Sequence, residues 1–205
     1  MLRVPGLLAM LLVGSLSVTS RFGVSADDLP PGVIARLGSP DLRNRQGVEG
    51  VAFSPDSQQL ASAGWGDSIR IWDLSTGKQN RRIRPGGMTF AVAFSPDGTK
   101  LASVGSNQVR LWDLDSNQEL FSSDLQQERI TGIAFAPDGL TFATGGAKEA
   151  VMLWDVETGD DLVHLHTTNG GQDVHPVAFS PSGALLASGD RTGTIRVWNL
   201  VTGVT

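Results

Sequence analysis

The sequence predicts an all-β protein built from four copies of one unit of about 40 residues, and three observations predict it. The hexapeptide VAFSPD occurs twice, and the close variants IAFAPD and VAFSPS occur once each. A tryptophan follows the phenylalanine of each copy by 18 or 19 residues, at the end of a run rich in β-branched residues. Between these landmarks lie clusters of serine, proline, aspartate and glycine, which are typical of tight turns.

The two landmarks keep the same period along the chain. The phenylalanines are Phe53, Phe94, Phe135 and Phe179, which lie 41, 41 and 44 residues apart. The tryptophans are Trp72, Trp112, Trp154 and Trp198, which lie 40, 42 and 44 residues apart. Chance does not produce two independent landmarks with a common period over four copies, so the chain contains an internal repeat.

The residue pattern of each unit predicts four short strands. The first contains Val-Ala-Phe or Ile-Ala-Phe, the second Leu-Ala-Ser or Phe-Ala-Thr, and the third ends at the tryptophan. Turn residues separate the first two strands, as in Ser-Pro-Asp-Gly at 95–98, where proline presets φ and glycine takes the left-handed position. Thr-Gly pairs mark the next turn, and a fourth strand is predicted at 78–84, 118–123 and 161–166.

Four strands in a unit of about 40 residues that ends in Trp-Asp resemble a blade of the WD40-repeat family. The resemblance covers residues 33–205 and implies a β-propeller or partial propeller of four antiparallel blades. The four repeats lie at 48–87, 88–128, 129–171 and 172–205, and the last of them is incomplete. An N-terminal segment at 27–47 precedes them.

The repeats depart from the family pattern at a hydrogen-bonded tetrad. The family's tetrad contains a Gly-His histidine, a Ser or Thr, an Asp and the tryptophan. The second position is kept by Ser62, Ser103, Thr144 and Ser188, but no Gly-His pair occurs. The Asp positions hold Gly66, Ser106, Lys148 and Thr192. We therefore expect Trp72, Trp112, Trp154 and Trp198 to be structural, with packing between blades as the main constraint.

The fourth repeat lacks its outer strand, and the segment VIARLG at 33–38 is a candidate clasp that would supply it. Closed family propellers commonly have seven blades, so a ring of four is unusual. Self-association, or association with further propeller blades, is the expected alternative to closure by the clasp, because an open stack exposes apolar faces.

Residues 1–26 have the pattern of a secretory signal peptide: a basic start, an apolar run of about 15 residues and small residues before Asp27-Asp28. A retained anchor is the alternative. The pattern predicts an exported protein, periplasmic or secreted, similar to bacterial-type exported WD40 proteins.

Composition excludes several classes of function. The 16 Lys and Arg residues against 21 Asp and Glu give a net charge of −5, which argues against a nucleic-acid surface. The absence of cysteine excludes thiolate metal sites and cysteine nucleophiles. With three histidines and no motif for a cofactor, we expect no metal and no cofactor. No stretch outside the leader is long enough for stable membrane insertion.

Candidate binding residues come from the family's geometry. The resemblance places Trp65 and Arg191 on the rim of the narrower propeller face, and it places Glu49, Phe90, Thr131 and His175 along the channel. Trp and Arg are common in binding hot spots. The alternative for Trp65 is a purely structural role over the apolar edge of its own blade.

These features predict a non-enzymatic scaffold that binds other proteins through the propeller face. The alternative is an envelope propeller enzyme, or a sugar- or ligand-binding module, with its site in the axial channel. The channel positions contain no pair of carboxylates, which favours binding over catalysis.

Overall fold

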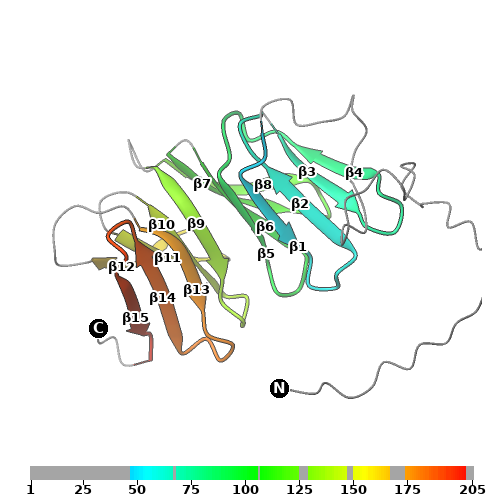
Figure 1. Ribbon diagram of the computed structural model, residues 1–205. Coiled ribbons are helices and arrows are strands. Elements are labelled where there is room, and N and C mark those ends of the chain that lie inside the picture. The colour runs from blue at the N-terminus through cyan, green and yellow to red at the C-terminus, as the bar shows by residue number, and fades with distance from the viewer. Residues whose placement is uncertain are drawn as a thin grey trace, which may run out of the picture.

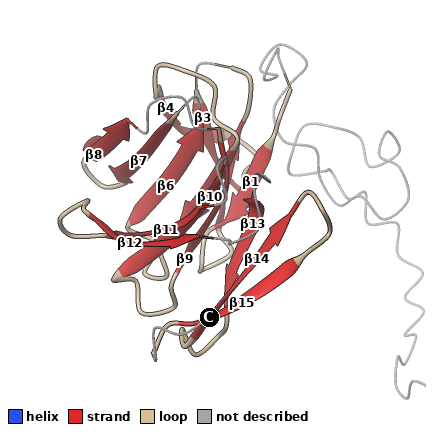
Figure 2. Cartoon of the chain, turned by 90° about the vertical axis from the view of Figure 1, so that its left-hand side faces the viewer, coloured by secondary structure: helices blue, strands red, loops and turns tan. Residues whose placement is uncertain are grey.

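In the part of the chain that it describes, the computed structural model contains 15 β-strands and no helix. The structure describes residues 47–66, 68–105, 107–124, 129–146, 150–166 and 174–201. The expected signal peptide and clasp strand lie outside these residues. The described chain consists of strands joined by loops (Figure 2). It therefore holds no helix long and apolar enough to cross a membrane. The predicted all-β class is confirmed.

The strands form four antiparallel sheets, one for each repeat, and strands that follow one another along the chain lie side by side. We call each sheet a blade. The first blade contains β1 (Gly50–Phe53), β2 (Gln59–Ala63), β3 (Ile69–Asp73) and β4 (Gln79–Ile83). The second contains β5 (Ala91–Phe94), β6 (Lys100–Gly105), β7 (Gln108–Asp113) and β8 (Gln118–Asp124). The third contains β9 (Ile130–Phe135), β10 (Thr141–Gly146), β11 (Ala150–Asp155) and β12 (Asp161–His166). The fourth contains β13 (Val174–Phe179), β14 (Leu185–Asp190) and β15 (Ile195–Asn199).

The turn between the first two strands of a blade is built by its own side chains. In the second blade, the Ser95 hydroxyl donates a hydrogen bond of 2.5 Å to the Asp97 carboxylate, and the Thr99 N–H donates to the same oxygen at 3.0 Å. Gly98 follows with φ +73°, a conformation that costs glycine little. The first blade repeats this turn with Ser57 at φ 57° in the glycine position.

One hydrogen bond between side chains links the second and third strands of every blade. The indole N–H of the tryptophan donates to the Ser or Thr hydroxyl of the neighbouring strand, and all four tryptophans are buried. The four bonds are Trp72 to Ser62 at 2.8 Å, Trp112 to Ser103 at 2.9 Å, Trp154 to Thr144 at 2.9 Å and Trp198 to Ser188 at 3.1 Å. The part of the tetrad present in the sequence is thus formed.

Each blade has two apolar faces because successive side chains of a strand point to opposite sides. We call the face that carries the tryptophan the leading face and the opposite one the trailing face. In the first blade Phe53 pairs with Leu60, and Leu60 pairs with Trp72, so these residues share the leading face. Ile69 and Ile71 lie on the trailing face.

The hydrophobic core lies between blades rather than within one. Ile69 and Ile71, on the trailing face of the first blade, form one cluster with Val92, Phe94 and Trp112, on the leading face of the second. The second and third blades meet in the same way, with Phe121 of the second blade stacked on Phe142 of the third at 6.1 Å between ring centroids. A third cluster joins the third and fourth blades. Each junction therefore pairs a trailing face with a leading face.

The four blades lie in a row, with the first (cyan) and the fourth (red) at its opposite ends (Figure 1). The first strands of successive blades are neighbours, because β1 contacts β5, β5 contacts β9 and β9 contacts β13. These inner strands line the side of the row that corresponds to a propeller axis.

Candidate functional site

The inner strands line an open cavity of about 540 Å³. Its lining includes Glu49, just before β1, Phe90, just before β5, and Thr131 on β9. Gly50 allows the close approach of the first two inner strands, because a Cβ there would lie 2.8 Å from the carbonyl oxygen of Phe90. Three of the residues expected along the channel thus line one concave surface.

The fourth blade contributes Pro176 and Val177 to the cavity. His175 belongs to β13, but its side chain lies outside the described residues.

Trp65 and Glu49 meet at one end of this cavity. Trp65 lies in the loop between β2 and β3, and its side chain is 48% exposed. The indole N–H donates a hydrogen bond to the Glu49 carboxylate, which holds the ring in one orientation. The structure therefore presents an exposed aromatic surface whose polar atom is already satisfied.

A second aromatic residue of the cavity, Phe90, makes a cation–π contact with Arg129. The guanidinium of Arg129, in the segment that leads into β9, lies 4.7 Å from the centroid of the Phe90 ring. Such cation–π contacts are worth about 0.5–1 kcal/mol at exposed sites. Sequence reasoning missed Arg129 because the residue precedes the repeated motif, and no pattern within one repeat pairs it with Phe90. We call Glu49, Trp65, Phe90, Arg129 and Thr131 the axial rim.

Arg191 does not belong to this group. It lies in the exposed loop between β14 and β15, in the fourth blade, whereas Trp65 lies in the equivalent loop of the first. Figure 1 shows these two blades at opposite ends of the row. The structure thus separates the two rim residues that the sequence singled out.

The Arg191 loop is held by Asp190. Its carboxylate accepts hydrogen bonds from the Thr192 hydroxyl at 2.5 Å and from the Arg196 guanidinium at 2.6 Å. These two bonds hold the pKa of Asp190 well below its usual range.

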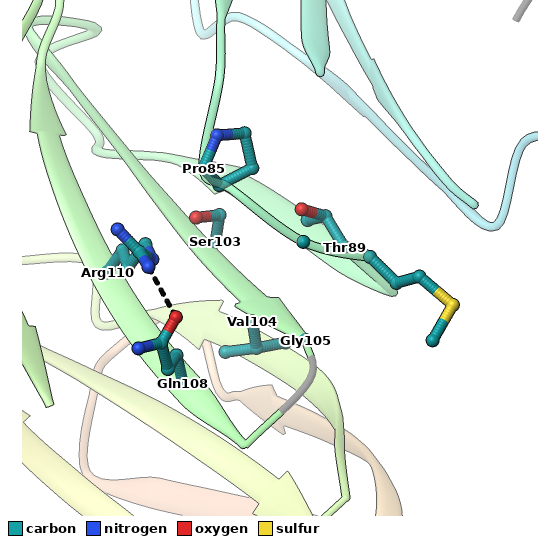
Figure 3. Close-up of a pocket in the computed structure, with 9 residues that line it drawn as sticks. Pro85, Thr89, Ser103, Val104, Gly105, Gln108 and Arg110 are labelled. Carbon is teal, nitrogen blue, oxygen red and sulfur yellow. Dashed lines mark hydrogen bonds between the residues drawn. The ribbon is translucent and has the colours of Figure 1, made fainter. Parts of the chain in front are cut away.

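Two other depressions do not resemble ligand sites. One, at the junction of the first two blades, is lined by residues that include Thr89, Ser103, Gln108 and Arg110 (Figure 3). Its volume of about 10 Å³ holds no more than one water molecule. Arg110 and Gln108 already bond to each other there.

The other depression has a volume of about 740 Å³ and lies among the turns at the opposite ends of the strands. Its carboxylates include Asp97 and Asp155, which accept hydrogen bonds from their own turns. The Ser95 hydroxyl and the Thr99 N–H lower the pKa of Asp97 to about 2. These carboxylates therefore stabilise turns.

No catalytic constellation is apparent in the described part of the chain. No group of three or more His, Asp or Glu residues there could hold a metal ion. His164 and Asp161 bond at 2.7 Å, but both are exposed on the outer strand β12, far along the blade from the axial rim. Glu49, the carboxylate of the cavity, is already engaged by Trp65.

The repeated blades, their Trp–Ser or Trp–Thr bonds and the stacking of leading on trailing faces define a WD40-type β-propeller protein. Residues 45–205 match the family model described as the N-terminal β-propeller domain of nucleolar protein 10-like proteins. The chain belongs to this family.

Individual relatives share part of the chain. The small ribosomal subunit protein RACK1y of Oryza sativa subsp. japonica is 31% identical over 118 residues, 53% of this chain and 34% of its own length. Human WD repeat-containing protein 3 is 30% identical over 117 residues, 56% of this chain and 12% of its own length. FIZZY-RELATED 3 of Arabidopsis thaliana is 28% identical over 115 residues, 53% of this chain and 24% of its own length. The matches thus span about a third or less of these relatives.

These names correct the localisation expected from the sequence. The family is named for a nucleolar protein and the first relative is a ribosomal one, so the expectation of an exported, periplasmic or secreted protein is wrong. The relatives named above do not support a bacterial-type exported protein either. The expectation depended on a short apolar run with one preceding arginine, a pattern of low specificity that carries no information about the repeats.

Proposed function

We propose that the protein is a non-enzymatic scaffold that binds an extended segment of another protein along the axial rim. The observation that carries this proposal is the exposed Trp65 ring, held by Glu49 beside the open cavity. One relative supports it, since RACK1y is named as a protein of the small ribosomal subunit, which is an assembly of many components.

The rim has the composition of a binding surface. Its two aromatic rings offer rigid apolar area, which is what hot-spot residues supply. Its charges have opposite signs, with Glu49 at the first blade and Arg129 between the second and third. We therefore expect the bound segment to place an apolar side chain on Trp65, with a basic residue near Glu49 and an acidic one near Arg129.

Binding is favoured over catalysis because the cavity offers one carboxylate among its described side chains. A general acid–base pair needs two titratable groups placed around the same reacting atom. The described lining of the cavity offers no feature that favours the expected alternative, which is an enzyme or a sugar- or ligand-binding module with its site in the axial channel.

Selection of displayed peptides against the full chain tests the proposal. Peptides that bind should lose about tenfold or more of their affinity when Trp65→Ala removes the ring, as measured by fluorescence anisotropy. Leu162→Ala is the matched control, because Leu162 is an equally exposed apolar residue on the outer strand β12, and it should change nothing. Peptides that bind the Trp65→Ala protein as tightly as the parent would show that the axial rim is not the binding surface.

A further inference from the structure

The leading face of the first blade is exposed where every other leading face is covered. Val51 and Phe53 on β1 are 62% and 65% exposed. The equivalent residues of the second blade, Val92 and Phe94, are 6% and 8% exposed, because the trailing face of the first blade packs on them. The same apolar pair therefore lies at the end of the row, where no blade of the described chain packs on it. Trp72, on the same face, is buried, so the exposed area is the half of the face nearest the axis.

The trailing face of the fourth blade is exposed in the same way. Ile195 and Val197 on β15 are 76% and 58% exposed. Their equivalents in the first blade, Ile69 and Ile71, are fully buried. Val109 and Leu111 in the second blade are fully buried as well. Two large apolar surfaces thus lie at opposite ends of one molecule.

These two surfaces have the chemistry of the two sides of an existing junction. Between the first and second blades, Ile69 and Ile71 pack against Val92, Phe94 and Trp112. At the ends of the row, Ile195 and Val197 take the place of the isoleucine pair, and Val51 and Phe53 repeat the valine–phenylalanine pair. The free trailing face is therefore matched to the free leading face.

We propose that a second copy of this chain covers the end faces, with the trailing face of the fourth blade of one copy packed on the leading face of the first blade of the other. Within the chain, all three junctions pair a trailing with a leading face, so we assign a head-to-tail contact rather than a face packed on its own copy. A head-to-tail contact closes when the rotation between subunits returns to the start. Two copies close with two such junctions, and the resulting eight blades lie within the known range for propellers.

This assembly also completes the cavity of the axial rim. In one copy, the cavity is lined by inner strands of the four blades and remains open. The inner strands of the second copy would form its other wall. The proposal is independent of the proposed function, because it follows from the exposure of the two end faces and from their match to an existing junction.

The first test is the mass of the full chain in solution, measured by light scattering over a range of concentrations. We expect twice the chain mass of 21.7 kDa. Ile195→Asp should restore the mass of one chain, because a carboxylate cannot be buried against Val51 and Phe53. The side chain of Ile195 is largely exposed, so this change should leave the fold of the single chain intact, and Leu162→Asp on β12 serves as the control that keeps the double mass.

The mass of one chain at every concentration would overturn the proposal, and would mean that another segment or another protein covers the faces. A double mass that Ile195→Asp leaves unchanged would overturn it as well.

The second test uses the absence of cysteine to establish the direction of the contact. Val51→Cys and Val197→Cys proteins are mixed and oxidised, and the disulfide-linked products are separated by mass. A head-to-tail contact predicts that the mixed disulfide forms in preference to either symmetric one, whereas Val163→Cys, exposed on β12, should not cross-link with either. Preferential Val51→Cys or Val197→Cys homodimers would show like faces packed together and would overturn the proposal.

Discussion

At the scale of single residues, one tryptophan in each blade hydrogen-bonds to a neighbouring strand, and in the second, third and fourth blades it also packs between blades. The Trp112 indole donates to Ser103 within its own blade, while its ring packs against the trailing face of the blade before it. The same side chain thus aligns two strands and fills a junction between blades. The sequence lacks the His and Asp that complete this network in related propellers, so we expect packing of the ring to carry more of the stability.

We expect Trp112→Ala to lower the free energy of unfolding by about 3–5 kcal/mol, because it leaves a large cavity between two blades. Trp112→Phe should cost about 1–3 kcal/mol, since it keeps much of the packing but leaves the buried Ser103 hydroxyl without its donor. Urea denaturation measures both values.

Trp65→Ala is the control for that series, with an expected change of about 0.5 kcal/mol or less at an exposed position. If Trp112→Ala destabilised the protein no more than Trp65→Ala, the ring would not be a packing element.

At the scale of elements, the turns are stabilised by carboxylates that accept hydrogen bonds from their own loop. Asp97 in the β5–β6 turn and Asp73 in the β3–β4 turn are examples, and hydroxyl donors lower the pKa of both. The same arrangement recurs at Asp155 in the third blade, so these aspartates stabilise turns.

These lowered pKa values predict a loss of stability in acid. The pKa of Asp97 falls from its ordinary value of 3.8 to about 2 on folding, chiefly through the Ser95 hydroxyl. A lowered pKa in the folded state adds stability above the unfolded pKa, and this stability disappears as the pH falls towards the folded pKa. Thermal unfolding at a series of pH values should therefore show a falling Tm below about pH 4.

Asp97→Asn removes the titrating group but keeps an oxygen acceptor. Its Tm should fall less steeply with acid than that of the parent protein. An identical slope in both proteins would mean that Asp97 contributes nothing to the acid sensitivity.

A matched pair of glycines tests how tightly a turn is packed on the neighbouring blade. Gly159 has φ +77°, and a Cβ there would lie 2.6 Å from the Phe121 ring. Gly98 has φ +73°, but a Cβ there would meet Pro55 at an ordinary 3.6 Å. We expect Gly98→Ala to cost about 1–2 kcal/mol for its backbone conformation alone, and Gly159→Ala to cost more in urea denaturation. Equal costs would indicate that Phe121 moves aside freely.

At the scale of the whole molecule, stability comes from contacts between successive blades, and each junction repeats the same pairing of faces. A residue at one position of the repeat is therefore buried or exposed according to whether a blade follows it. Ile71 is fully buried at the first junction, whereas Val197, at the same position of the fourth blade, is exposed.

This difference predicts unequal costs for equivalent substitutions. Ile71→Ala should lower the free energy of unfolding by about 2–5 kcal/mol. Val197→Ala, measured in dilute solution where single chains predominate, should change it by about 0.5 kcal/mol or less. Calorimetry or urea denaturation at low protein concentration measures both values. A large loss of unfolding free energy for Val197→Ala under these conditions would mean that the residue's own chain covers it.

Much of the fold followed from local pattern. The turn residues, the alternation of Val51 and Phe53, and the pairing of Trp112 with Ser103 depend on neighbours within one repeat, so one sequence carries enough information to predict them. The axial rim was predicted in part. Glu49, Phe90 and Thr131 share a position in the repeat, and the structure places them around one cavity. Arg129 and the Trp65–Glu49 bond could not be predicted, because the residue types at these positions differ from repeat to repeat.

The sequence by itself determined the number of repeats, their strands and the residues that hold each blade together, because those interactions lie within one period of about 40 residues. Only the tertiary structure decided which apolar faces are covered and which lie open at the ends of the row, because each face has similar apolar residues in every blade. Their burial depends on whether another blade packs there. The distance between Trp65 and Arg191 could not be predicted for the same reason. Their positions in the repeat are equivalent, and only the arrangement of the blades places them at opposite ends of the row.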